Sequence, residues 1–278
     1  MSIIIFTLII LIGSYFAGLL GSLTGLGGGF VIIPLLTLLL HVDIHYAIGA
    51  SLISVIATSS GSAAAYVKEG ITNIRLGMFL EIATTAGAMV GAIIAIYIPA
   101  NYIAIIFGCI LIFSALASLR KKAENITTEK NYLAEKLKLN SSYPGPSGLV
   151  QYGVTHVAGG FFMMIFAGVI SGLLGIGSGA LKVIAMDGIM RIPFKVSTTT
   201  SNFMIGVTAA ASAVVYLQRG YIDPGLSMPV VIGVLLGALS GSKILVNSKS
   251  SGWLRWIFTV VVTALAIQMI YHGITGKI

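Results

Sequence analysis

Charged side chains and cysteine are both scarce in this chain. Charged residues make up 9% of the 278 residues, against about 25% in ordinary soluble domains. The single cysteine, Cys109, excludes an internal disulfide, a cysteine-rich metal site and a two-thiol relay. Apolar residues make up 57% and the mean hydropathy is +1.02, which excludes a water-soluble globule. Long apolar runs without β-barrel alternation predict an all-α polytopic membrane protein.

Several other signals are missing. The chain has no paired-histidine zinc motif, no Gly-x-Ser-x-Gly elbow and no paired aspartates, so we expect neither an enzyme nor a cofactor. The start, Met1 to Phe6, lacks a basic region and a cleavage site, and predicts a retained first span. The net charge of +8 does not predict a nucleic-acid partner, because basic residues in loops are what orientation in a lipid bilayer requires.

What the chain does contain is a duplication. The glycine-rich stretch from Gly18 to Gly29 recurs as Gly168 to Gly179, and the register then holds without a gap. A fixed offset over this length predicts two homologous repeats. The positions that it pairs include Ser51 with Ser201, Thr58 with Thr208, Ser62 with Ser212, Tyr66 with Tyr216, Gly87 with Gly237 and Gly91 with Gly241.

The hydropathy pattern divides the chain into a first repeat (1–119), a polar cytoplasmic linker (120–150) and a second repeat (151–278). Eight to ten membrane segments are expected, two of them short and interrupted by glycine. The expected segments are 3–23, 29–40, 46–67, 76–97 and 102–119 in the first repeat, and 151–174, 180–190, 194–216, 225–246 and 253–273 in the second.

The distribution of lysine and arginine favours inverted repeats. If the two short segments cross the membrane, the halves are inverted and the basic loops lie with the linker, leaving only Arg219 and Lys277 outside. If they dip in and return, the halves are parallel, and Arg191 and Lys195 face outward. The positive-inside rule favours the first arrangement.

Each glycine break is a candidate binding site. Backbone groups at membrane depth must be buried in protein or line a wet cavity, and paired broken segments in a duplicated transporter mark its central site. Helix starts converging there would favour an anion. The alternative is close helix packing, which we prefer for Gly87 and Gly91 and for Gly237 and Gly241. The break residues assigned to substrate binding are Gly25, Gly27, Gly28, Gly29, Phe30, Gly175, Gly177, Ser178 and Gly179.

Polar side chains near the breaks complete the predicted substrate site. Lys182 lies in an apolar segment, where a lysine is a functional hypothesis by default. The partner of Lys182 could be a bound oxyanion or Asp187. Alternatively, the lysine side chain could extend to the membrane interface. Ser201 and Asn202 offer donors to an anion, or a polar contact between helices. Ser51 and Thr58 belong to a small polar stripe on their helix.

Three further groups have weaker assignments. Glu81 could carry a coupling proton, or bond to a neighbouring helix at the cytoplasmic mouth. His156 is a packed or interfacial histidine in preference to a relay. His41, Asp43 and His45 have the spacing of a metal chelate, but loop polarity is the better interpretation, and we assign no metal site.

The twin glycine motifs, Pro34, the Ala47–Leu52 segment and its partner, and the spans of Gly87 and Gly237 resemble the TauE/SafE sulfite exporter family, also called the four-toluene sulfonate uptake permease family. The resemblance covers nearly the whole chain outside the linker. It implies an integral membrane transporter of sulfite, organosulfonates or similar anions. The second repeat departs from the pattern, with Ser178 in the glycine string and Ile184 in place of the proline.

The function predicted is therefore a cell-membrane transporter of small sulfur-containing anions, which works by alternating access around the two breaks and uses a coupling proton or sodium ion. The alternative is a facilitator or channel for another small solute or a cation, held by the carbonyl ends and Glu81. A purely structural role does not explain two breaks in the same register.

Overall fold

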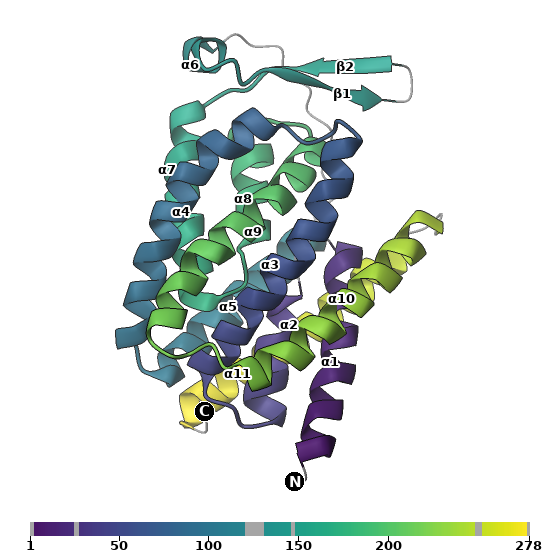
Figure 1. Cartoon of the computed structure of the whole chain (residues 1–278). Helices are drawn as coiled ribbons and strands as arrows, with labels where there is room; N and C mark the ends of the chain where they lie inside the picture. The colour runs from purple at the N-terminus through teal and green to yellow at the C-terminus, as the bar shows by residue number, and fades with distance from the viewer. Residues whose placement is uncertain (1–2, 25–27, 120–130, 146–147, 248–251, 277–278) are drawn as a thin grey trace.

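The computed structural model (Figure 1) describes residues 3–24, 28–119, 131–145, 148–247 and 252–276. The first repeat forms α1 (Ile3–Thr24), α2 (Gly29–Pro34), η1 (Leu35–Leu39), α3 (Ile44–Lys68), α4 (Ile74–Tyr97) and α5 (Ala100–Leu119). The linker holds α6 (Tyr132–Lys136), β1 (Ser141–Gly145) and β2 (Gly148–Tyr152). The second repeat forms α7 (Val157–Leu174), α8 (Gly179–Val183), η2 (Ile184–Ile189), α9 (Phe194–Gln218), α10 (Pro224–Asn247) and α11 (Gly252–Thr275).

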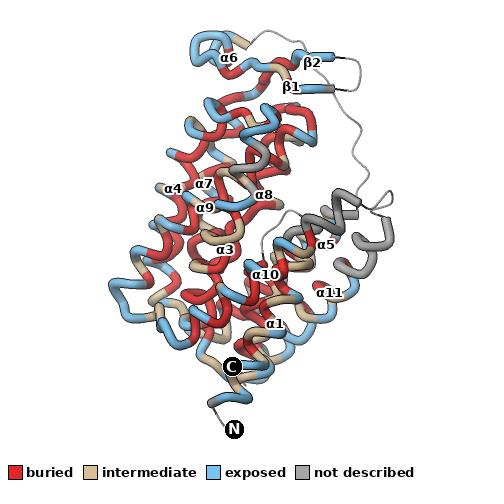
Figure 2. Tube along the Cα trace, turned by 45° about the vertical axis from the view of Figure 1, so that its right-hand side comes forward, coloured by how far each residue is buried: buried red, intermediate tan, exposed pale blue. Residues whose placement is uncertain are grey.

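Helices dominate both repeats, and they have the length and polarity of membrane spans. Among the described residues, seven helices are long and apolar enough to cross a membrane: α1, α3, α4, α5, α7, α9 and α10. Large apolar side chains such as Ile82, Phe162 and Leu239 are exposed. Figure 2 shows that buried and exposed positions alternate along the helices, as expected when one side of each helix is covered by its neighbours. Such a surface suits lipid rather than water. The prediction of an all-α polytopic membrane protein is confirmed.

The second repeat begins later than expected. We predicted a span from 151, but α7 begins at Val157, and residues up to Tyr152 form a strand. β1 and β2 pair antiparallel, with Tyr143 opposite Val150 and Ser141 opposite Tyr152. The expectation was wrong here because Tyr143 and Tyr152 bury their rings against the bundle, and this packing selects a hairpin.

The linker elements are docked on the bundle through Asn73. Its side-chain nitrogen donates to the Leu139 oxygen (2.8 Å) and to the Tyr152 hydroxyl (2.9 Å), and its side-chain oxygen accepts from the Leu76 amide, capping α4. Burial raises the pKa of Tyr152, so the phenol stays neutral in this contact. Figure 1 places the linker elements at one end of the helix bundle, with the start of α1 and the end of α11 at the opposite end.

Helices α4 and α7 pack so closely that only glycine fits between them. A Cβ atom at Gly87 would lie 2.2 Å from the Ile165 oxygen, and one at Gly91 would lie 2.0 Å from the Val169 oxygen. The predicted packing role of these two glycines is confirmed. Since the contacting residue numbers rise together on both helices, α4 and α7 run parallel.

Helices α1 and α10 make the equivalent contact. A Cβ atom at Gly233 would lie 2.4 Å from the Leu11 oxygen, and one at Gly237 would lie 1.9 Å from the Tyr15 oxygen, so this pair is parallel too. In the repeat register α1 corresponds to α7, and α10 corresponds to α4. The two repeats therefore contact each other twice in the same way, once through α4 and α7 and once through α1 and α10.

Two more pairs join corresponding helices of the two repeats, and both run antiparallel. Helix α3 packs against α9, and α5 packs against α11. In each pair the contacting residue numbers rise on one helix as they fall on the other. The contacts that fix these directions are Gly49 with Tyr221, just after the end of α9, and Ser59 with Gly206 for α3 and α9, and Asn101 with Gly273 and Gly108 with Ala266 for α5 and α11.

Candidate functional site

The two glycine breaks lie against each other. A Cβ atom at Gly29, where α2 begins, would lie 3.2 Å from the Gly175 oxygen of the second break and 2.5 Å from Ser51 Oγ. Ser51 Oγ in turn donates a hydrogen bond of 2.9 Å to that Gly175 oxygen. One hydroxyl of α3 therefore ties the second break to the start of α2, and the absence of a side chain at Gly29 makes the approach possible.

The second break holds three left-handed residues. Gly175 has φ 65°, Gly177 has φ 70° and Ser178 has φ 44°. Glycine takes this conformation without cost, whereas a serine in it is strained. Ser178 is held in place by its hydroxyl, which donates to the Ala167 oxygen of α7 at 2.7 Å. The backbone therefore leaves helical geometry where α7 ends, and α8 begins again at Gly179.

The other predicted binding residues have distinct surroundings. Ser201 donates to the Gly179 oxygen at 3.2 Å, which fastens α9 to the second break. Its neighbour Asn202 is buried on α9. Thr58 donates to the Ser54 oxygen of its own helix at 3.0 Å. The Gly28 oxygen accepts the first amide bonds of α2. Gly25 and Gly27 lie outside the described residues.

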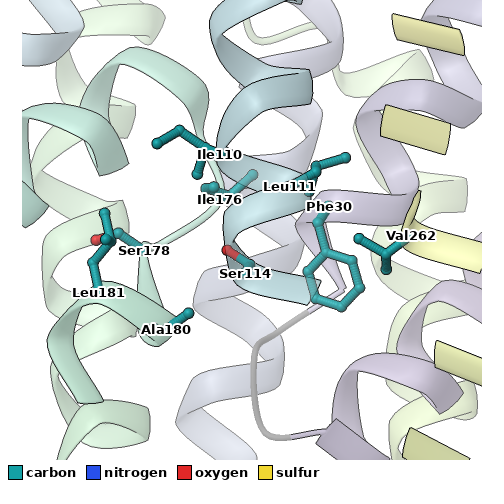
Figure 3. A pocket seen from close by; sticks show the side chains of 10 residues that line it. Phe30, Ile110, Leu111, Ser114, Ile176, Ser178, Ala180, Leu181 and Val262 are labelled. Carbon is teal, nitrogen blue, oxygen red and sulfur yellow. The ribbon is translucent and has the colours of Figure 1, made fainter. Parts of the chain in front are cut away.

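A small cavity lies where the two breaks meet α5 and α11 (Figure 3). Its volume is about 20 Å³, which is room for about one water molecule. Apolar side chains dominate the walls, so the cavity as it stands is too small and too apolar for an oxyanion. Its lining residues are Phe30, Ile110, Leu111, Ser114, Ile176, Ser178, Gly179, Ala180, Leu181 and Val262.

Lys182 follows the cavity residues along α8 but faces α4 and α9. Its side chain is fully buried, and its Nζ donates to Thr208 Oγ1. Nζ also lies 4.0 Å from Glu81 Oε2, and Thr208 Oγ1 lies 2.6 Å from Glu81 Oε1. Thr85 adds a bond of 3.2 Å to the same carboxylate oxygen. The lysine, two threonines and glutamate form one buried polar cluster, which we call the Lys182–Glu81 cluster.

This cluster corrects two expectations. The partner of Lys182 is not Asp187 on its own segment but Glu81 of the other repeat. Nor does the lysine extend to the interface, because none of its side chain is exposed. Glu81 does bond to a neighbouring helix, as one of its two interpretations predicted, and that bond is part of the same cluster.

Sequence reasoning missed Thr208 and Thr85. Thr208 had a signal, since it is the repeat partner of Thr58 on a stripe of small polar residues. In the first repeat, however, the residue at the position of Lys182 is Ile32, so Thr58 has no lysine to contact. Thr85 had no signal beyond its position one helical turn after Glu81.

The histidines keep their ordinary interpretations. Asp43 Oδ1 accepts from the His45 amide at 2.9 Å and lies 3.0 Å from His45 Nδ1, and this hydrogen bond lowers the pKa of Asp43. The other ring nitrogen of His45 lies 3.2 Å from the Ala95 oxygen. His156 precedes α7 with its ring beside Thr155. These contacts fix the helix starts and their loops.

Paired spanning helices around two touching broken segments are the architecture of a membrane transporter. The chain belongs to the family described as "Sulfite exporter TauE/SafE", whose sequence pattern matches residues 10–269. It is thus a multi-pass membrane transporter and not an enzyme, and the resemblance noted from the motifs is confirmed.

Named relatives agree with this assignment. The "Probable membrane transporter protein YunE" of Bacillus subtilis (strain 168) is 30% identical, over 97% of this chain and 98% of its own. The "Probable membrane transporter protein YdhB" of the same organism is 28% identical, over 85% of this chain and 89% of its own. A "Probable membrane transporter protein" of Xylella fastidiosa (strain 9a5c) is 26% identical over 96% of both chains. No solved structure matches the chain.

Proposed function

We propose that the protein moves a small sulfur-containing anion, such as sulfite or an organosulfonate, across the cell membrane at the point where its two glycine breaks meet. The observation that carries this proposal is the contact of Gly29 with the Gly175 oxygen. Two irregular backbone segments, far apart in sequence, are buried at one point, and such segments occur at membrane depth where they are buried in protein or line a water-filled cavity. The sulfite exporter family supplies the class of substrate.

The mechanism that we propose is alternating access between two inverted halves. In parallel repeats, corresponding helices run in the same direction. Here α3 and its counterpart α9 are antiparallel, and so are α5 and its counterpart α11. The parallel pairs α1 with α10 and α4 with α7 fit the same inversion, because each joins non-corresponding helices. Rocking one inverted half against the other would open the breaks to either side in turn.

The linker end of the bundle is proposed to face the cytoplasm. Arg75 and Lys138 meet there, with the Arg75 guanidinium 3.4 Å from the Lys138 oxygen. Arg191 and Lys195 lie at the start of α9, and Lys68 lies at the end of α3, both at this end. This distribution follows the positive-inside rule.

The substrate groups are proposed to be the break residues, with Ser51, Ser201 and Asn202 as polar donors and Lys182 as the positive charge. Glu81 is proposed to carry a coupling proton. Because the present cavity holds about one water, substrate binding must be accompanied by separation of the breaks.

A thermal-shift panel on the detergent-purified protein tests this proposal. A ligand that binds the folded state raises its apparent stability, so sulfite, isethionate, sulfoacetate, thiosulfate and sulfate are compared with carboxylates and with sodium, potassium and neutral solutes. A shift with a sulfur oxyanion, which is lost in the double variant Lys182→Met/Glu81→Gln, is expected. A shift with a cation or a neutral solute alone would refute the anion proposal and favour a facilitator for that solute.

A further inference from the structure

The Lys182–Glu81 cluster joins three elements that are distant in sequence. Lys182 comes from α8, Thr208 from α9 and Glu81 from α4. Lys182 is fully buried, and the Glu81 side chain is only 9% exposed. With both groups ionised, the cluster has no net charge and therefore attracts no anion.

The hydrogen atoms of the cluster can be assigned. A lysine ammonium only donates, so the Thr208 oxygen must accept from it. The one Thr208 proton is then free to point at Glu81 Oε1 at 2.6 Å or at the Met204 oxygen at 2.9 Å. The carboxylate is the stronger acceptor because it is charged. Thr208 thus lies between the two charged groups and links them through its hydrogen bonds to both.

One carboxylate oxygen is left over. Glu81 Oε2 is buried and has no hydrogen bond within the described part of the chain. It lies 4.0 Å from Lys182 Nζ, which is too long for a hydrogen bond. A buried acceptor without a donor is costly. A proton bound to Oε2 would cancel the negative charge of the carboxylate.

The described helices packed around this pair hold few other charged groups. On α4 the other charged residue is Arg75, in the first turn, and α7 contains none. On α9 the charged residue is Lys195 in its first turn, and the Tyr216 hydroxyl faces the Gly172 and Leu173 oxygens. α5 contains no charged residue, and η2 contains Asp187, which has its own interactions. Loss of the negative charge at Glu81 therefore leaves the positive charge of Lys182 uncompensated.

We propose that Glu81 is the internal counter-ion of Lys182, and that a proton taken up by Glu81 frees the ammonium group for the transported anion, so that one proton travels with each anion in the same direction. This inference rests on the proposed function and adds the role of Glu81 as counter-ion, the direction of proton movement and the stoichiometry. The only covalent change is the O–H bond that forms at Glu81 Oε2 and breaks again when the proton leaves. The proton comes from the water that reaches the site, binds Glu81 Oε2 and leaves with the anion on the other side.

The balance of charge favours anion binding when Glu81 is protonated over anion binding when Glu81 is ionised. If an anion entered while Glu81 stayed ionised, two negative charges would share one ammonium group inside the protein, which is strongly unfavourable. With Glu81 protonated, the anion and Lys182 again form a neutral pair. The distance is short, because Lys182 is one helical turn beyond Ser178, which lines the cavity between the breaks. A rotation of the lysine side chain exchanges one partner for the other.

The test measures protons and anions together in the purified full-length protein. Isethionate serves as the probe, because it carries one negative charge that is constant near neutral pH. Binding is followed by thermal shift and calorimetry over a pH series, and proton uptake is recorded with a pH indicator in weak buffer. The variant is Glu81→Gln, which keeps the shape of the side chain, and the matched control is Glu69→Gln at the exposed end of α3.

In the wild type we expect about one proton taken up per anion, and an affinity that falls about tenfold for each pH unit at which Glu81 is ionised in the free protein. Glu81→Gln should bind the probe with an affinity that no longer depends on pH, and without proton uptake. Glu69→Gln should behave as the wild type. A merely structural role for Glu81 would instead lower binding at every pH and leave the slope unchanged.

The two proposals fail in different ways. Binding of a probe by the wild type without proton uptake would overturn the coupling inference and leave the transport proposal in place. Absence of binding by every sulfur anion would overturn the transport proposal itself. Because Lys182→Met alone leaves a buried carboxylate and risks misfolding, the double variant Lys182→Met/Glu81→Gln removes both charges together. We expect it to fold and to bind no anion, and binding by this folded variant would also refute the inference.

Discussion

Replacing Gly29 with alanine tests the contact between the breaks. In an ordinary helix this change is stabilising, by up to about 1 kcal/mol. At Gly29 the new Cβ atom would lie 2.5 Å from Ser51 Oγ, 3.1 Å from Val55 Cγ2 and 3.2 Å from the Gly175 oxygen. The Ser51 hydroxyl is the worst of these contacts and must move. If it rotates away, it gives up its hydrogen bond to Gly175.

The magnitude follows from these contacts. Losing the Ser51 hydrogen bond costs about 1 kcal/mol and leaves a buried oxygen unpaired, which brings the loss to about 1–3 kcal/mol. Overpacking against Val55 and Gly175 adds to it. We therefore expect Gly29→Ala to destabilise the protein by about 2–3 kcal/mol. Ser51→Ala should lose about 1–2 kcal/mol through the hydrogen bond alone.

The double variant Gly29→Ala/Ser51→Ala decides between this account and a diffuse packing effect. Without the hydroxyl the 2.5 Å contact disappears, so the double variant should lose at least about 1 kcal/mol less than the sum of the single variants. Unfolding is measured by melting temperature and denaturant titration in one detergent. Additive effects, within about 0.5 kcal/mol, would refute the claim that Ser51 is held between the two breaks.

Two further predictions concern the fold. Gly172→Ala places a Cβ atom 1.9 Å from the Ala88 oxygen and should lose about 1–3 kcal/mol, whereas Gly61→Ala, with no atom within 4 Å, should not lower the melting temperature. Equal melting temperatures would refute the close packing of α4 and α7. Asn73→Asp keeps the α4 cap but loses the donor to Leu139, so hydrogen exchange of the backbone amides in β1 and β2 should accelerate while α4 stays protected. Asn73→Ala loses the cap as well, so it should also accelerate exchange at the start of α4. Unchanged exchange in the hairpin would contradict the docking of the linker.

Much of the fold could be predicted because each membrane span is encoded by one contiguous stretch of the sequence. Apolar runs of the right length identified the long helices, and the fixed repeat offset identified the two breaks as equivalent. The breaks were recognisable because glycine clusters interrupt apolar runs in both repeats. Gly87 and Gly91 were assigned to packing from their four-residue spacing alone. Each of these signals lies within one segment of the chain.

The contacts of the candidate site and the hairpin could not be predicted, because they depend on which distant segments pack together. Lys182 was singled out as a buried cation, but its partner Glu81 could not be chosen from sequence, since 127 residues separate Glu81 from the bridging Thr208. The hairpin of β1 and β2 was missed for a similar reason. Its alternation of exposed Leu149 and Gln151 with buried Tyr152 is short, and the surface that buries the tyrosines belongs to other elements.

The two repeats share their backbone design but not their charges. Both have a glycine break, a parallel glycine contact and a serine beside the break, whereas Ile32 and Val231 stand at the repeat positions of Lys182 and Glu81. In the proposed exchange of roles between inverted halves, the helix contacts of the two end states are nearly the same, so packing gives little preference for either. The Lys182–Glu81 pair differs between them, because it is present in one repeat only. Its protonation and its anion are then what decide which state is populated, because a ligand shifts an equilibrium only by its different affinity for the two states.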